Sequence, residues 1–388
     1  MKRSTNRILT THVGSLPRPD DLVTMLADRE AGKAVDEQAF RQRVRHAVDD
    51  VVRQQVEAGI DVVTDGEVGK AGFTNYVDQR LAGFEARPQM PGAPRIYGAA
   101  YLREYQAFPD YYDSEEQYRP RSICSIPRVC SGPISYIGQE QLQRDIENIQ
   151  TAVQGLKVEE VFMPAISFSD IHTLRKNEYY ASDDEYMAAI ADAMREEYEG
   201  IIDAGFVVQI DDPLLVTYYA RHPELSVEDC RRWAEHRIEI LNHSLRGLPM
   251  DRIRFHTCYS IDQGPRVHDM ELKDIVDVLL KINAGAYSFE AGNPRHDHEW
   301  RVWETVKLPE GRILIPGFIT NSTVLVEHPQ LVADRIVRYA RAVGRENVIA
   351  SADCGFASVA RVGHLEIVMA KFQALAEGAR LATKELWS

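Results

Sequence analysis

A histidine and a cysteine stand two residues apart in the stretch FHTCYS, at His256 and Cys258. A glutamate, Glu290, and a second cysteine, Cys354, each end or follow a later β-rich run. Zinc accepts sulfur, nitrogen and oxygen ligands in tetrahedral geometry, and thiolates discriminate against hard cations such as Mg²⁺. The four residues are therefore a candidate zinc site. The plainer alternative makes Cys354 a core thiol and Glu290 a salt-bridge partner.

Short β-rich runs alternate with helical patterns along the chain, and these elements must position the four residues. Nine runs predict strands: 7–15, 61–67, 128–135, 159–166, 206–213, 252–258, 286–291, 312–319 and 347–356. Apolar residues recur at helical spacing in 183–205 and 331–344. Strands that alternate with helices indicate a parallel sheet.

We therefore predict an α/β fold, a single (β/α)₈ TIM barrel over residues 1–388, in which one of the nine runs is an extra strand or a loop. A doubly wound sheet is the rival fold, but no GxGxxG follows the first strand and no GxxxxGK[ST] occurs. The segment 84–125 is dense in Pro, Gly and Tyr and interrupts the alternation. It predicts an insertion, either a plain surface excursion with a hairpin and helical turns or a lid or subunit contact.

A barrel places its active site at the C-terminal ends of its strands. The polar residues at those ends are Ser15, Glu67, Asp211, His256, Cys258, Glu290 and Cys354. His256 and Cys258 face the same way because alternate residues of a strand share a face. Carboxylates at Glu67 and Asp211 are suited to hold a substrate ammonium group, although strand-end salt bridges are their ordinary role.

Composition narrows the class of protein. The formal net charge is −14 without a sustained basic run, which argues against nucleic acid or an anionic membrane as partner. No apolar stretch of about 18 residues exists, and the basic N-terminus lacks the apolar core of a secretory signal. Five scattered cysteines do not suggest a disulfide scaffold, so we expect a cytoplasmic protein with free or metal-bound thiols. The sequence leaves a homo-oligomer open.

The motifs THVGSLPRP, TDGE, QIDDP, HTC, SFE and DCGF occur in this order. Together they resemble the catalytic barrel of cobalamin-independent methionine synthase, and more closely the short, single-barrel members of that superfamily, from about residue 8 to the end. The resemblance implies zinc ligation by His256, Cys258, Glu290 and Cys354. It also implies a homocysteine site anchored by Ser15, Glu67 and Asp211. The expected activity is zinc-dependent methyl transfer to homocysteine or a similar thiol, with a zinc-bound thiolate as nucleophile.

Two departures from the family concern the methyl donor. The chain has a single barrel, so a folate site shared between two barrels would be incomplete. The family's histidine after the strand that follows the zinc glutamate is absent, because Thr320, Asn321 and Ser322 occupy that region. We therefore expect a small methyl donor or a methylated corrinoid protein. His296 and His298, close after Glu290, are candidate general acids, and the alternative is a loop that only orders Glu290.

Three other functions stay open at this point. An epoxide-opening transferase of the coenzyme M type, or a thioether lyase, would use the same zinc site, but a sulfonate substrate favours arginine over the carboxylates of Glu67 and Asp211. A uroporphyrinogen decarboxylase would need no metal and a basic pocket. A non-catalytic protein with a structural zinc would close the four ligands off from substrate.

Overall fold

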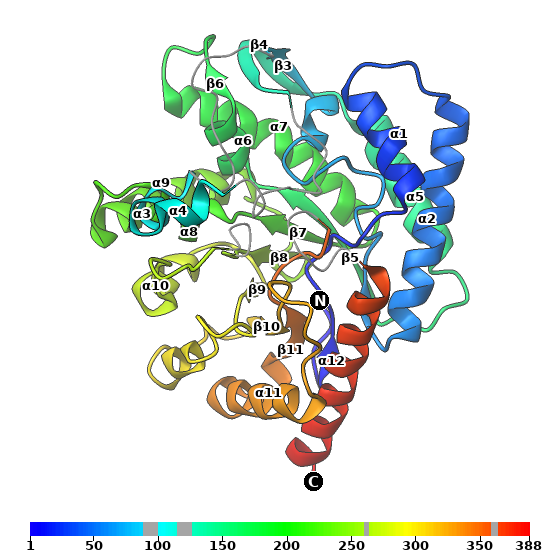
Figure 1. Cartoon of the computed structure of the whole chain (residues 1–388), viewed down its shortest axis with the longest axis vertical. Coiled ribbons are helices and arrows are strands. Elements are labelled where there is room, and N and C mark those ends of the chain that lie inside the picture. The colour runs from blue at the N-terminus through cyan, green and yellow to red at the C-terminus, as the bar shows by residue number, and fades with distance from the viewer. Residues whose placement is uncertain (88–99, 115–125, 260–263, 358–363) are drawn as a thin grey trace.

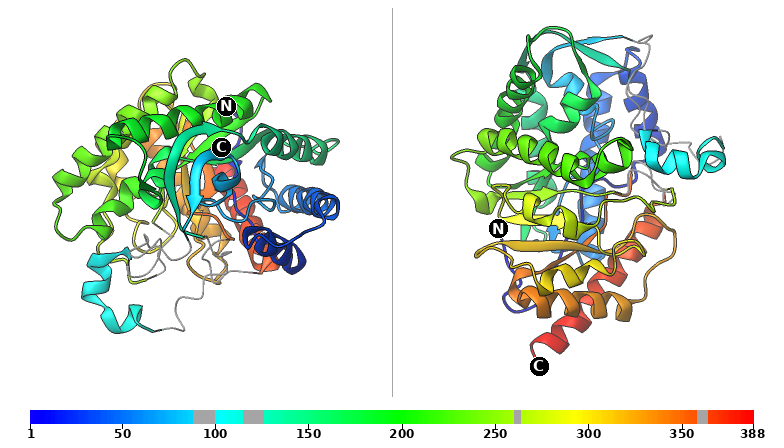
Figure 2. Two further views of the ribbon diagram at one scale, coloured as in Figure 1. Left: turned by 90° about the horizontal axis from the view of Figure 1, so that it is seen from above. Right: turned by 90° about the vertical axis from the view of Figure 1, so that its left-hand side faces the viewer.

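Eight parallel strands wrapped by helices form the body of the protein in the computed structural model, which describes residues 1–87, 100–114, 126–259, 264–357 and 364–388 (Figure 1, Figure 2). The barrel strands are β1 (Leu9–Thr10), β2 (Val62–Val63), β5 (Glu160–Ile166), β7 (Val207–Asp211), β8 (Ile253–His256), β9 (Ala286–Phe289), β10 (Ile313–Ile319) and β11 (Ile349–Ala352). Their order around the sheet is β1-β11-β10-β9-β8-β7-β5-β2. The predicted barrel is confirmed.

The two edge strands of this sheet, β1 and β2, are joined by hydrogen bonds rather than by a regular ladder. The Asp61 amide donates to the Thr10 carbonyl at 3.1 Å, and the Thr10 amide donates to Asp61 Oδ2 at 2.9 Å. Thr11 Oγ1 adds a bond of 3.0 Å to the Val62 carbonyl. These contacts bring the ends of the first two strands to the same pocket as the other six.

Helices follow the barrel strands and cover the outside of the sheet. The longer ones are α1 (Asp20–Glu30), α2 (Glu37–Glu57), α5 (Gln139–Ala152), α7 (Asp183–Asp203), α8 (Leu214–Arg221), α9 (Val227–Ser244), α11 (Pro329–Val343) and α12 (Leu365–Leu386). Short pieces are α6 (Phe168–Leu174), α10 (Val276–Leu279) and the 3₁₀ helices η1 (Tyr76–Gln79), η3 (Met250–Arg252), η4 (Leu272–Asp274), η5 (Glu299–Glu304) and η6 (Arg345–Asn347). Their starts are set locally: Ser226 and Asp229 form a reciprocal capping box at α9.

The ninth predicted strand lies outside the barrel. It is β4 (Arg128–Tyr136), which pairs antiparallel with β3 (Leu81–Ala86) and parallel with β6 (Lys176–Asn177) in a separate small sheet. The predicted insertion 84–125 therefore begins in a hairpin strand, and its described part continues with α3 (Leu102–Ala107) and α4 (Pro109–Tyr112). The remainder of that segment, 88–99 and 115–125, lies outside the described residues.

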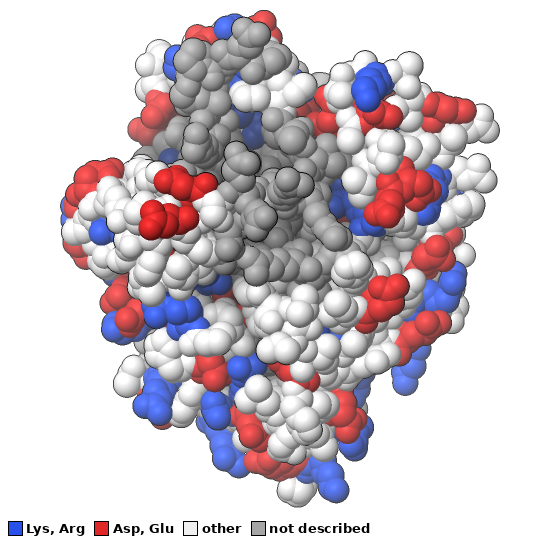
Figure 3. All heavy atoms as spheres, viewed as in Figure 1, with Lys and Arg blue, Asp and Glu red and all other residues white. Residues whose placement is uncertain are grey.

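Charged side chains of both signs are interspersed over the described part of the face in Figure 3. Among the described residues, no helix combines the length and apolarity that crossing a bilayer requires.

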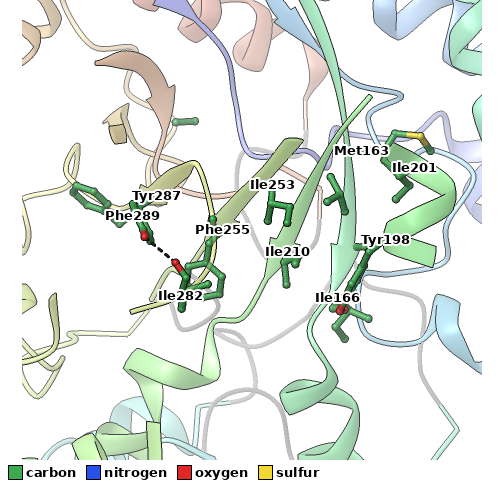
Figure 4. Packing of buried hydrophobic residues seen from close by; sticks show 14 of the residues in the cluster. Met163, Ile166, Tyr198, Ile201, Ile210, Ile253, Phe255, Ile282, Tyr287 and Phe289 are labelled. Atoms are coloured by element: carbon green, nitrogen blue, oxygen red, sulfur yellow. Dashed lines mark hydrogen bonds between the residues drawn. The ribbon is translucent and has the colours of Figure 1, made fainter. Parts of the chain in front are cut away.

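The core lies between the strands and their covering helices. Figure 4 shows Met163 and Ile210, from two neighbouring strands, on the side of Tyr198 and Ile201 of α7, and Phe255 of the next strand beside Ile282. Farther along the sheet, the Tyr287 hydroxyl donates to the Ile282 carbonyl at 2.9 Å, so a buried phenol is satisfied within its own layer (Figure 4). Because apolar burial holds the strands, their C-terminal ends are free to carry polar side chains.

Candidate metal centre

Three residues from two strand ends bring their ligand atoms together. The Nε2 or Nδ1 of His256 and the sulfurs of Cys258 and Cys354 all lie within 4.8 Å of one another. The two sulfurs are 3.0 Å apart, although the residues are 96 positions apart in the chain. We call His256, Cys258 and Cys354 the thiol cluster. Two thiols and an imidazole at this separation suit a tetrahedral zinc ion.

The ring of His256 is oriented by its neighbour on the adjacent strand. His256 on β8 lies in register with Asp211 on β7. Its Nδ1–H donates to Asp211 Oδ1 at 2.8 Å, and Gln209 Nε2 donates to the same oxygen at 2.8 Å. His256 Nε2 is buried and has no hydrogen-bond partner among the described residues. Such an orphaned ring nitrogen with its partner nitrogen on a carboxylate is the arrangement of metal-binding histidines.

The Cys258 thiol is disfavoured from ionising by its surroundings. The neighbouring Cys354 thiol, burial, and the carboxylates of Glu290 and Asp211 all raise the pKa of Cys258 well above its usual range. A bound cation reverses this balance, because thiolate ligands are deprotonated when they bind.

Glu290 lies near these thiols, but the structure does not bring it into the group of three. Its Oε1 accepts the Tyr259 amide at 2.6 Å, and its Oε2 accepts Arg266 at 2.8 Å and Asn293 at 2.7 Å. Metal binding by Glu290 would require one of these bonds to be shared or exchanged. Its role as fourth ligand stays a prediction.

A buried chain of charges extends from Glu290 through His296. Arg266 donates to both Glu290 and Asp269, each at 2.8 Å. His296 donates through Nε2 to Asp269 at 3.1 Å and through Nδ1 to Glu299 at 2.8 Å. Burial opposes a charge on the ring, but the two carboxylates outweigh it and raise the pKa of His296 to about 9. With both nitrogens engaged, His296 orders the loop that holds Glu290.

His298, the other predicted acid, is exposed on the surface side of this loop. It precedes η5 and lies close enough to Glu271 to help lower the pKa of that carboxyl, after the larger effect of Lys273. Neither His296 nor His298 belongs to the thiol cluster. Their part in catalysis stays a prediction.

Glu67 occupies a strained turn after β2. Its φ is +52°, and Glu67 and Arg266 are the two non-glycine residues with positive φ in the described part of the chain. Gly14, with φ +141°, makes room for it, since a Cβ there would lie 2.7 Å from Glu67 Oε1. Burial raises the pKa of Glu67 to about 7, against the opposing charge of Lys70. Asp211 contributes to that increase, which places the two predicted anchors near each other. Strain of this kind is characteristic of binding sites.

The first and last motifs meet at Ser15. The Phe356 amide donates to the Ser15 carbonyl at 2.7 Å, and the Ala357 amide lies 3.4 Å from Ser15 Oγ. A Cβ on Gly355 would lie only 2.1 Å from Ser15 Oγ, so glycine is required beside Cys354 for this approach. Ser15 is thereby fixed next to the loop that carries one cluster thiol.

Asp353 is a buried site residue that the sequence motifs did not single out. Its Oδ1 accepts the amides of Ala291 and Gly292 at 2.9 and 2.7 Å, and its Oδ2 accepts Asn293 at 3.0 Å. Burial raises the pKa of Asp353 to about 6. The carboxylate ties the end of β11 to the loop after Glu290. The only sequence signal for Asp353 was its place directly before Cys354. Arg266 and Asp269 were also missed, because they lie in a loop without a recognisable sequence pattern.

Comparison with known families identifies the family to which the chain belongs. The family described as the catalytic domain of cobalamin-independent synthase matches residues 8–93 and 171–374, three quarters of the chain. This chain therefore belongs to the cobalamin-independent methionine synthase superfamily, and the resemblance of its motifs is confirmed.

Individual relatives align over most of the chain. A methionine synthase of Thermococcus kodakarensis is 25% identical over 379 residues, which are 97% of this chain and 94% of the relative. A methionine synthase of Sulfolobus acidocaldarius is 29% identical over 280 residues, 70% and 68% of the two chains. Among solved structures, a B12-independent methionine synthase from Shewanella sp. W3-18-1 in complex with selenomethionine superposes with a TM-score of 0.70 at 19% identity, over 98% of this chain and 99% of the other. That likeness supports the fold.

Proposed function

We propose that this chain, acting over 1–388 as one catalytic barrel, is a zinc-dependent methyltransferase that transfers a methyl group to homocysteine or a similar amino-thiol. The observation that carries the proposal is the thiol cluster, with two sulfurs 3.0 Å apart beside an orphaned, carboxylate-oriented imidazole nitrogen. The names of the relatives point to the same reaction.

In this proposal, different residues bind the metal and the substrate. His256, Cys258 and Cys354 would hold the metal, with Glu290 as a fourth, displaceable ligand. When bound, zinc supplies the Lewis acidity that makes a thiol nucleophilic at neutral pH. Glu67 is poised for a substrate ammonium group because its carboxylate accepts no hydrogen bond within the described residues. An approaching cation would lower its pKa again and form a buried ion pair.

Atoms balance in the proposed transfer without an oxidant or reductant. A carbon–sulfur bond forms between the substrate sulfur and the methyl group, the bond from that carbon to the donor breaks, and the thiol proton is released. A small methyl donor or a methylated corrinoid protein would both satisfy this scheme.

Metal content and zinc-edge X-ray absorption test the proposal directly. We expect about one zinc per chain and a new sulfur neighbour when homocysteine is added. Coenzyme M serves as the matched control thiol, because its sulfonate cannot pair with Glu67. A sulfur neighbour gained with coenzyme M alone would favour the epoxide-opening transferase. If zinc gains no sulfur neighbour with either thiol, thiol activation is rejected.

Cluster variants supply the second test. We expect Cys354→Ser and His256→Ala each to lose zinc and methyl transfer while circular dichroism shows an intact barrel. Cys230→Ser, which changes a buried cysteine of α9 outside the cluster, is the control and should keep its metal. Full activity in a metal-free cluster variant would contradict the proposed mechanism.

A further inference from the structure

A cavity of about 340 Å³ lies among the helices at the side of the barrel. It is bounded by α1, α2, α5 and residues 69–80, and these helices lie side by side in two views of the molecule (Figure 1, Figure 2). None of its lining residues belongs to the thiol cluster or to the predicted substrate anchors. Its volume falls within the range of pockets that bind small molecules, about 300–1,000 Å³.

The lining of this cavity is cationic although the whole chain is acidic. Six lining side chains are Lys or Arg, and two, Asp145 and Glu147, are acidic, whereas the chain carries a net charge of −14. Three of the cations are already in ion pairs: Arg29 with Glu37 at 3.1 Å, Arg80 with Glu197 at 3.2 Å, and Arg144 with Glu140 at 3.8 Å. These three guanidinium groups therefore already have carboxylate partners.

Arg41 and Arg45 are the cations that remain available. They lie one turn apart on α2, so their side chains share a face. Both are exposed, and neither forms an ion pair with a carboxylate within the described residues. Two guanidinium groups on one side of a pocket suit a phosphate or carboxylate, which they can bind through paired hydrogen bonds.

Deeper in the cavity the lining changes character. Leu26, Phe40 and Val44 form a buried apolar wall. Lys70 is also buried, where its ammonium donates to the Pro164 carbonyl at 2.6 Å and lies 4.3 Å from the centre of the Tyr76 ring. The pocket therefore combines an apolar interior with a cationic rim.

We propose that this cavity is a second ligand site, which binds a small organic anion with its phosphate or carboxylate group at Arg41 and Arg45 and its apolar body against Phe40 and Val44. No residue is shared between this site and the thiol cluster. The ligand class is thus an amphipathic anion of about the size of an aryl phosphate.

Isothermal titration calorimetry with phenyl phosphate tests this site on the full-length protein. We expect one molecule to bind per chain, inorganic phosphate to bind at least tenfold more weakly, and benzyl alcohol to give no measurable heat. Those two comparison ligands separate the charged group from the ring. No binding of phenyl phosphate, or equal binding of benzyl alcohol, would overturn the proposal.

Matched variants locate the bound anion. The double variant Arg41→Glu/Arg45→Glu should weaken phenyl phosphate binding at least tenfold, and Arg41→Gln/Arg45→Gln is the milder substitute if the charge reversal unfolds the chain. Arg53→Glu changes another exposed arginine of α2 that does not line the cavity, and it should leave the affinity within twofold of wild type. An equal loss in Arg53→Glu would show nonspecific charge attraction. Loss of binding in Cys354→Ser would place the anion at the thiol cluster instead, and either result rejects the second site.

Discussion

Asp211 and Glu67 lie near each other, but the structure gives them different partners. Asp211 accepts the Nδ1–H of His256, whereas Glu67 keeps its carboxylate available at a strained turn. Sequence reasoning assigned both residues to one role, substrate binding. Because their contacts differ, we predict that substitutions of Asp211 and Glu67 impair different properties, zinc binding in the first case and homocysteine binding in the second.

Asp211→Asn should weaken zinc binding, because the amide removes the charge that orients the His256 ring. Losing such a partner typically reduces metal affinity by about 10–100-fold. Competition with a chromophoric chelator measures the zinc dissociation constant. An unchanged constant would return Asp211 to the role of substrate anchor alone.

Glu67→Gln should show the opposite pattern. Zinc affinity should match wild type, and homocysteine affinity should fall by about 10–100-fold, the cost of losing a hydrogen bond between charged groups. Thiol titration followed by zinc-edge absorption gives this affinity. A variant that binds homocysteine as tightly as wild type would exclude Glu67 as the ammonium site.

His296→Gln should destabilise the protein in a pH-dependent manner. The folded-state pKa of His296 is about 9, above the ordinary value of 6.5, so its stabilisation is fully present below pH 6.5 and is lost as the pH rises through 9. The shift corresponds to about 3 kcal/mol of unfolding free energy at low pH. Urea unfolding at pH 6 and pH 9.5 measures the difference between wild type and variant, which should shrink at the higher pH.

His298→Gln is the matched control, since that exposed ring should change the unfolding free energy by less than about 0.5 kcal/mol. A selective loss of turnover in His298→Gln would support its predicted role as general acid. An equal effect of both substitutions on stability, independent of pH, would contradict the buried charge network.

At the scale of elements, Arg103 makes several contacts between the described part of the insertion and the barrel wall. Arg103 of α3 donates to the carbonyls of Tyr219 at 2.6 Å and His222 at 2.9 Å, and also to Leu225. Its guanidinium lies 3.9 Å from the centre of the Tyr219 ring. A second link joins Glu104 to His268 at 2.8 Å. The described part of the insertion is thus fastened to α8 and to the loop after β8.

Arg103→Ala should release α3 and α4 while the barrel stays folded. We expect hydrogen exchange over 102–112 to accelerate at least tenfold and the midpoint of thermal unfolding to change little, because few barrel contacts are lost. Arg87→Ala, which removes an exposed pair with Glu85, is the control. Unchanged exchange in Arg103→Ala would show that other contacts hold this segment.

At the scale of the whole molecule, zinc should stabilise the folded chain. A metal that binds only the native state adds about 4 kcal/mol at a thousandfold excess over its dissociation constant. Differential scanning calorimetry of the metal-free protein should therefore show a higher unfolding temperature after zinc is added. Cys354→Ser should show no such increase, and an equal increase in that variant would place the stabilising ion elsewhere.

The architecture was predictable because apolar, β-rich runs in the sequence mark the strands. Eight of the nine predicted runs are barrel strands, and the ninth, 128–135, is β4 of the small sheet. The expected extra strand is therefore 128–135, but the sequence did not identify which of the nine runs it would be, because local composition reports extended backbone and not the partner strand. Pairing with β3 places 128–135 in the small sheet rather than in the barrel.

The sequence by itself determined the barrel and the family, and strand periodicity predicted that His256 and Cys258 lie on one face. Only the tertiary structure decided which side chains contact each other. It places Cys354 beside Cys258 and forms the hydrogen bond between His256 and Asp211. It also directs both ring nitrogens of His296 to carboxylates. Hydrogen bonds and ion pairs depend on distances between residues far apart in the chain, and those distances are fixed by packing of the whole barrel rather than by local pattern.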